Sequence, residues 1–234
     1  MKKLESSLMN MVIVLTAVAV VAGLLLGYIN QATSAPIAEA NEKALNDALA
    51  AVMPQGYDNQ PLTDSSTVKV NDISYKIYKA TQNGKFIGAA VETSANGFGG
   101  ELTLLVGFDK DGNIHNYSVL KHSETPGLGS KAGEWFKPQA KTRSMVEKVF
   151  GFEVSSEPKK SNILGMNPGT EPLTVTKDGG NVDAITASTI TSRAFLKAVN
   201  NAYAAYAAQN GQQVDTDAHS GASIKIKPED LKQN

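Results

Sequence analysis

Five hydroxyl side chains are crowded into seven residues near the end of the chain, immediately before a helix-forming run. They are Thr186, Ser188, Thr189, Thr191 and Ser192, with the carboxylate of Asp183 just upstream and "RAFLKAVNNAYAAYAA" following. The start of a helix offers free backbone N–H groups and the positive end of the helix dipole, and both favour a bound phosphate. Hydroxyl groups add further donors to phosphate oxygens. The cluster could therefore hold a phosphate, and one of its alcohols could carry that phosphate as an ester.

Two interpretations of this cluster stay open from the residues alone. Ser, Thr and Asp are favoured before helices because a side-chain oxygen accepts a backbone N–H, but one cap accounts for one or two hydroxyls. The other interpretation is a phosphate cradle with one esterified alcohol. An unassisted threonine hydroxyl is a poor nucleophile at neutral pH and needs activation, so we expect a separate transferase to attach the group.

The stretch "DAITAST", residues 183–189, resembles the flavinylation motif D-x-x-[ST]-G-A-T, whose last threonine is joined to FMN through a phosphodiester. Asp183, Thr186 and Thr189 match the motif, and Thr189 falls on the attachment position. Ala187 replaces the usual glycine and Ser188 replaces the usual alanine; both are small residues. The resemblance implies a covalent FMN on Thr189.

A second motif, "SETPGLGSK" at residues 123–131, resembles the E-T-P-G-L-G segment of the same family, and "NGFGGELTLLVGFDKDGNI" resembles its glycine-marked strand pair. The family comprises the FMN-binding domains of the G subunit of the Rnf electron-transport complex and of the C subunit of the sodium-translocating NADH:quinone reductase. Chain length and the simple connection between the motifs favour the first of these two.

The resemblance implies a membrane-anchored electron relay inside a multi-subunit translocase, between an iron–sulfur donor and a further flavin. The complex would couple electron flow between reduced ferredoxin and NAD⁺ to movement of Na⁺ or H⁺. A flavin transferase would attach the FMN, and the tether would prevent its loss outside the cell. The chain would have no substrate pocket of its own.

Glycines in the "ETPGLG" loop allow backbone conformations closed to other residues, so that main-chain N–H groups can approach a planar ring. Pro126 stiffens the turn, and Glu124 or Thr125 could hydrogen-bond to ring or ribityl atoms; an ordinary turn is the alternative. The residues expected at the cofactor are Thr189, Ser188, Thr186, Thr191, Ser192, Asp183, Glu124, Thr125, Gly127, Leu128 and Gly129.

Further side chains admit both a functional and an ordinary structural interpretation. Trp135 and Phe136 could stack on the flavin or form a core aromatic pair. Four cations could neutralise the phosphate or the flavin, or be ordinary solvated charges: Lys121, Lys131, Lys177 and Arg193. Asp183 could serve recognition by the transferase rather than electron transfer.

Composition excludes several classes of chemistry. The 234 residues are 41% hydrophobic with a net charge of −1, which disfavours nucleic-acid binding. There is no cysteine, which rules out disulfides, thiolate nucleophiles, zinc–thiolate sites, thiolate-held iron–sulfur clusters and haem attached through C-x-x-C-H. The three scattered histidines, His115, His122 and His219, do not indicate a metal site.

The N-terminal segment predicts a membrane anchor. Val12 to Ile29 is an uncharged 18-residue run, close to the ~20 residues that cross a bilayer as a helix. Lys2 and Lys3 precede it, which places the N-terminus in the cytoplasm and the rest of the chain outside the inner membrane. A cleaved signal peptide ending near "ATSA" is the alternative, although Pro36 follows and the run is long for one.

The remainder predicts an α+β fold with an antiparallel sheet and flanking helices. An amphipathic helix is expected over residues 35–53, strands over 67–70, 74–80, 85–94, 100–109 and 114–122, and two-residue hairpins at Asn83-Gly84 and Asp111-Gly112. Two short helical pieces follow within residues 131–151, and a last helix begins near Ser188. We expect an anchor in residues 1–30, a helix and link in 31–66, an FMN-binding domain in 67–208 and a mobile tail in 209–234.

Two functions of other classes compete with the electron relay. "SEPK" at Ser156 to Lys159 matches the S-x-x-K of one class of serine hydrolases, but the partner motifs S-D-N and K-T-G are absent. A binding or assembly module that kept the fold without the flavin is the second, and the altered Ala187-Ser188 pair keeps it open.

Overall fold

The computed structural model describes residues 8–139 and 160–211. It divides into two units, residues 1–45 and 46–234. The expected "SEPK" segment, the second helical piece after Pro138 and nearly all of the expected tail lie outside the described residues.

The first unit consists of the N-terminal part of the long helix α1 (Leu8–Val52). An 18-residue window of this helix is apolar enough to cross a membrane, and no part of the window is buried against protein among the residues described. Large aliphatic side chains such as Leu15, Leu24 and Leu26 are therefore exposed. A helix of this length with an uncovered apolar surface fits a single membrane span.

The span and the following helix, expected as separate segments, are continuous in the structure. Residues 8–52 form one helix, and Pro36 lies inside it. Proline removes one backbone donor and usually kinks or ends a helix, so the helical propensity of its neighbours must offset that cost. Alanines on both sides of Pro36, among them Ala35 and Ala38, supply that propensity.

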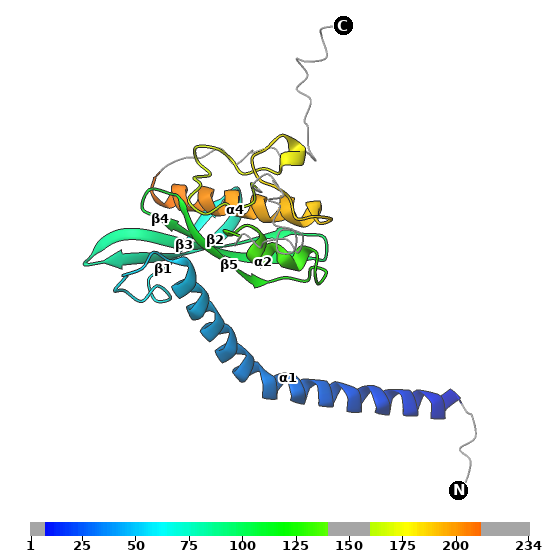
Figure 1. Cartoon of the computed structure of the whole chain (residues 1–234). Helices are drawn as coiled ribbons and strands as arrows, with labels where there is room; N and C mark the ends of the chain where they lie inside the picture. The colour runs from blue at the N-terminus through cyan, green and yellow to red at the C-terminus, as the bar shows by residue number, and fades with distance from the viewer. Residues whose placement is uncertain (1–7, 140–159, 212–234) are drawn as a thin grey trace, which may run out of the picture. The chain divides into compact units, whose positions relative to one another are not determined.

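The second unit is built on a five-stranded antiparallel meander with strand order β1-β2-β3-β4-β5 (Figure 1). The strands are β1 (Ser65–Val70), β2 (Ile73–Gln82), β3 (Lys85–Asn96), β4 (Glu101–Asp109) and β5 (Ile114–Lys121). All five strands expected from alternating apolar residues are present. The nearly continuous apolar run of β4 is explained by its place between β3 and β5, with both faces covered.

The two expected hairpins differ. Asn83 and Gly84 both have positive φ, 51° and 73°, as a two-residue type I′ turn requires. Between β4 and β5 only Gly112 has positive φ, and the connection is four residues long. The Asp109 carboxylate stabilises this longer turn by accepting the backbone N–H groups of Asp111 and Asn113, each at 2.9 Å.

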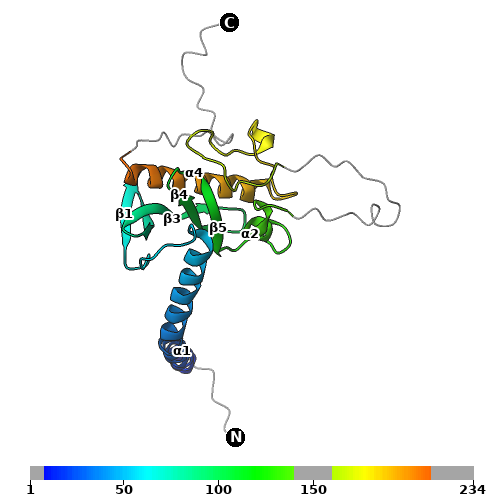
Figure 2. The ribbon, with the colours of Figure 1, turned by 60° about the vertical axis from the view of Figure 1, so that its left-hand side comes forward.

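Helix α4 (Thr189–Gln209) covers one face of the sheet, as both views show (Figures 1 and 2). Its expected inner residues, Phe195, Val199, Ala202 and Tyr206, are all buried. Phe108 of β4 packs against the Tyr206 ring at 5.1 Å between centroids. Phe136, which follows the short helix α2 (Ala132–Trp135), stacks on Phe195 at 4.4 Å and is fully buried, so it belongs to this core.

The end of α1 covers the opposite face of the sheet. Val52 and Met53 are buried there, and the amide of Asn116 donates a hydrogen bond to the Ala51 carbonyl at 2.8 Å. Gly107 of β4 lies directly beneath: a Cβ at this position would be 1.9 Å from the carbonyl oxygen of Val52. Close backbone packing thus requires glycine at residue 107.

We predict that Gly107→Ala destabilises the domain by about 2–3 kcal/mol, because the new methyl group collides with backbone rather than with a movable side chain. Urea unfolding of the detergent-solubilised chain, followed by fluorescence of Trp135, measures the effect. Gly133→Ala is the matched control. A Cβ at this helical position would lie 4.0 Å from its nearest neighbour, a methyl group of Val119, so we expect no loss of stability there. Equal losses in the two variants would contradict this account of the packing.

Candidate functional site

The "ETPGLG" loop and the start of α4 meet at the side chain of Glu124. The Thr191 hydroxyl donates a 2.7 Å hydrogen bond to Oε2 of Glu124, across 67 positions in the chain. Both side chains are buried, Glu124 being 5% exposed and Thr191 1%. The second carboxylate oxygen, Oε1, accepts the N–H of Gly99 at 3.2 Å. One carboxylate therefore joins three segments, which we call the Glu124 junction: the 97–100 turn between β3 and β4, the 124–129 loop, and the first turn of α4.

Three glycines make room for this carboxylate. A Cβ on Gly97 would be 2.0 Å from Glu124 Oε1, and one on Gly129 would be 2.4 Å from Oε2 and 2.8 Å from the Thr191 hydroxyl. A Cβ on Gly99 would be 2.1 Å from the carbonyl oxygen of Ser123. Close packing around this buried acid and its chain neighbour therefore explains three of the glycines in the two motifs: Gly97, Gly99 and Gly129.

The 124–129 loop is a compact turn. The carbonyl oxygen of Thr125 accepts the N–H groups of Leu128 and Ser130, and the N–H of Gly127 donates to the Ser130 hydroxyl at 2.9 Å. Gly127 has φ of 77°, where glycine is favoured. The loop places Thr125 and Gly127 in solvent and leaves Leu128 40% exposed.

The cluster hydroxyls differ in their surroundings. Ser192 is fully buried; its hydroxyl oxygen accepts a hydrogen bond from the N–H of Ile185 and its O–H donates one to the carbonyl of Ser188, both at 2.9 Å. Ser188 is also buried, 9% exposed, and it precedes α4 without a side-chain capping hydrogen bond. Thr186 is exposed. Thr191 and Ser192 thus serve as internal hydrogen-bonding groups, whereas Thr189 has a different partner.

Thr189, the first residue of α4, is partly exposed, and its hydroxyl accepts a hydrogen bond from the Lys177 ammonium at 3.2 Å. Lys177 lies in the short helix η2 (Thr176–Asp178). The carboxylate of the adjacent residue, Asp178, accepts two hydrogen bonds from the guanidinium of Arg193, which lies one turn into α4. One comes from Nε (2.7 Å) and the other from a terminal nitrogen (2.5 Å). These hydrogen bonds lower the pKa of Asp178 from its ordinary value, so the carboxylate stays ionised.

Ala187 adopts an uncommon conformation. Its φ is 61°, in the left-handed region that disfavours residues with a Cβ. This is the position where the flavinylation motif has glycine. The turn that presents Thr189 therefore requires a left-handed residue, and this chain fills the position with alanine.

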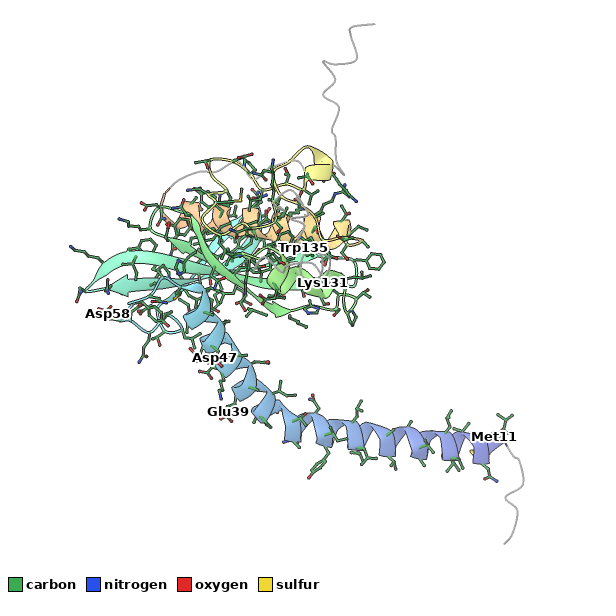
Figure 3. The ribbon with its side chains drawn as sticks, viewed as in Figure 1. Met11, Glu39, Asp47, Asp58, Lys131 and Trp135 are labelled. Atoms are coloured by element: carbon green, nitrogen blue, oxygen red, sulfur yellow. The ribbon has the colours of Figure 1, made fainter. Side chains whose placement is uncertain are left out.

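Asp183 connects the site to neighbouring segments. Its carboxylate accepts the backbone N–H of Lys160 at 2.8 Å, and its carbonyl accepts the indole N–H of Trp135 at 3.0 Å. Figure 3 shows Trp135 and Lys131 in the region of α2 and its preceding turn. Asp183 and Trp135 thus hold the segment before Thr189 against the rest of the domain. Lys121 and Lys131 are exposed.

Sequence reasoning missed two apolar side chains of the Glu124 junction. Phe98, 71% exposed, lies at the tip of the 97–100 turn, and Ile190, 52% exposed, follows Thr189. Together with Leu128 they are three of the four large apolar side chains exposed between residues 46 and 211 of the described structure. A large aromatic residue between glycines in "NGFGG" was the available signal. No group of three or more His, Cys, Asp or Glu residues in the described chain could hold a metal ion.

Comparison with known proteins identifies the family of this domain. Residues 97–204, which include the whole Glu124 junction and Thr189, match the FMN-binding domain family. The fold is thus that of an FMN-binding domain, here preceded by a helix that fits a single membrane span.

The chain is similar to the G subunits of ion-translocating oxidoreductase complexes from several bacteria. The protein of Stutzerimonas stutzeri is 34% identical, over 88% of this chain and 81% of that protein. The protein of Aliivibrio fischeri strain MJ11 is 34% identical, over 82% of this chain and 86% of that protein. The protein of Shewanella piezotolerans is 32% identical, over 75% of this chain and 78% of that protein. The chain belongs to this family of G subunits. The resemblance drawn from the two motifs is confirmed, as is the class of flavoprotein electron-transfer subunit.

We predict that the Glu124–Thr191 hydrogen bond is strongly coupled. Glu124→Ala and Thr191→Val should each destabilise the domain by about 2 kcal/mol, because each leaves a buried partner unsatisfied. The double variant should lose clearly less than the sum of the two, which a double-mutant cycle of urea unfolding measures. Glu101→Ala, at an exposed position, serves as the control and should change little. Additive effects would show that the two side chains act independently.

We further predict that Ala187→Gly stabilises the domain by about 1 kcal/mol, because it removes the strain of a left-handed alanine. Ala208→Gly, an exposed position with helical backbone in the last turn of α4, provides the opposite control and should lose up to about 1 kcal/mol rather than gain stability. Thermal unfolding of both variants beside the parent chain makes the comparison. A loss of stability in both would mean that residue 187 is not left-handed in solution.

Proposed function

We propose that this chain carries FMN covalently, through a phosphodiester to the Thr189 hydroxyl, and relays electrons through it within an ion-translocating oxidoreductase complex. The observation that carries the proposal is the contact of a partly exposed threonine hydroxyl with a lysine ammonium at the start of α4. A helix start and an ammonium group both favour a phosphate. The match to the flavinylation motif designates the same residue.

The surroundings of Thr189 suit the rest of the cofactor. FMN supplies the chemistry, since it exchanges two electrons with one partner and single electrons with another, while the protein sets its position and environment. The exposed side chains of Phe98, Leu128 and Ile190 offer apolar surface at the Glu124 junction for a planar ring. The exposed residue Thr125 offers its side-chain hydroxyl to ring or ribityl atoms.

Glu124 has a different part in this proposal. Its carboxylate is occupied by Thr191 and Gly99, so it assembles the site rather than contacting the flavin. Asp183 likewise fixes the segment before Thr189 through Lys160 and Trp135. Both residues act on the flavin's position through the backbone.

The location follows from the anchor. We propose a single-pass protein of the inner membrane with Lys2 and Lys3 on the cytoplasmic side and the FMN-binding domain outside. Covalent attachment would then keep the flavin from diffusing away. The partners are the other subunits of the complex and, during maturation, a flavin transferase.

The direct test compares intact masses of the full chain and its Thr189→Ala variant, each co-expressed with a flavin transferase. We expect the parent chain to gain the mass of FMN less one water, and Thr189→Ala to gain none. Thr189→Ser keeps an alcohol and is the matched control, with at least partial modification expected. Equal masses apart from the substitutions would contradict the proposal and would favour a binding module without flavin.

A further inference from the structure

Five alcohols lie within seven residues, yet the chemistry proposed above requires only one of them to be modified. Exposure alone does not select it, because Thr186 is more exposed than Thr189. The feature that distinguishes Thr189 is its cation: the Lys177 ammonium donates to its oxygen at 3.2 Å. The structure gives no such contact for Thr186, Ser188, Thr191 or Ser192 within the described residues.

Lys177 is held in place by its own segment. The bidentate ion pair between Asp178 and Arg193 fastens η2 to the first turns of α4, and the Asp178 side chain is only 10% exposed. Behind η2, the chain turns tightly: a Cβ on Gly180 would be 1.9 Å from the Thr174 hydroxyl, and the Thr176 N–H donates to the Val182 carbonyl at 2.8 Å. The lysine therefore projects from an anchored turn and not from a free loop.

We propose that Lys177, positioned by the Asp178–Arg193 ion pair, is the specificity residue that directs flavin attachment to Thr189 and neutralises the resulting phosphodiester. This inference rests on the proposed function. It adds the reason why one hydroxyl of the cluster is chosen.

The step balances without a redox change. Forming a phosphate ester from an alcohol needs an activated phosphoryl donor, here a flavin dinucleotide with its phosphoanhydride. The Thr189 oxygen forms a bond to the flavin-side phosphorus, the anhydride P–O bond breaks, the nucleoside monophosphate leaves, and the Thr189 proton passes to the transferase or to solvent. Lys177 stabilises negative charge on the phosphoryl oxygens during and after the transfer.

The test measures the initial rate of flavin transfer to the detergent-solubilised full chain, with purified transferase and flavin dinucleotide. Lys177→Gln removes a charge-assisted hydrogen bond to the transferred phosphate, and this loss should slow transfer roughly tenfold or more. Lys177→Arg keeps the charge and should restore most of the rate. Lys197→Gln makes the same charge change at an exposed position further along α4 and should leave the rate unchanged.

Two further measurements separate a charge effect from a structural one. Asp178→Asn weakens the anchor while keeping Lys177, and should give a rate between those of the parent and of Lys177→Gln. Raising the ionic strength from about 0.05 M to about 0.5 M should slow the parent chain more than Lys177→Gln, because an exposed charge is screened by salt.

The outcomes distinguish the two claims. A parent chain that accepts no flavin defeats the proposed function itself. A parent chain that is modified while Lys177→Gln reacts at the same rate and site overturns this inference alone. Equal slowing of the glutamine and arginine variants overturns it as well, because charge would then not be the property that matters.

Discussion

The buried carboxylate of Glu124 is the constraint on which the rest of the site depends. It is held by the Thr191 hydroxyl at 2.7 Å and the Gly99 N–H at 3.2 Å. Removing an acid from water is costly unless it is hydrogen-bonded, so the fold must bring these donors together. Doing so fixes the "ETPGLG" loop against the start of α4. It also requires glycine at positions 97 and 129, where a Cβ would overlap the carboxylate.

Around the Glu124 junction, the residues that hold the structure together differ from the residue proposed to carry the cofactor. Thr191 and Ser192 satisfy buried groups and keep the first turn of α4 in place. Thr189 keeps its hydroxyl at the surface, beside Lys177. The crowding of alcohols before one helix is thus explained by two roles: internal hydrogen bonding for some members, and presentation of one acceptor for the phosphate of the proposed FMN.

Much of the fold could be predicted because its signals are local. Alternation of apolar residues identified all five strands, and Ser188 marked the start of the last helix. Local signals failed where context outweighed them: Pro36 did not break α1, and the Asp111-Gly112 turn is lengthened by hydrogen bonds to Asp109. Contacts between residues far apart in the sequence could not be predicted from local patterns. The sequence singled out Glu124, Thr191 and Lys177 separately, but only the tertiary structure shows which of them meet.

The central claim is a bond at one oxygen, and fragmentation of one peptide tests it most directly. Trypsin cleaves after lysine and arginine, so residues 178–193 form a single peptide that contains all five alcohols. In protein from its native membrane, the account predicts that this peptide carries FMN and that the fragment ions assign the added mass to Thr189. Flavin on Thr186, on any other peptide, or on none would contradict it.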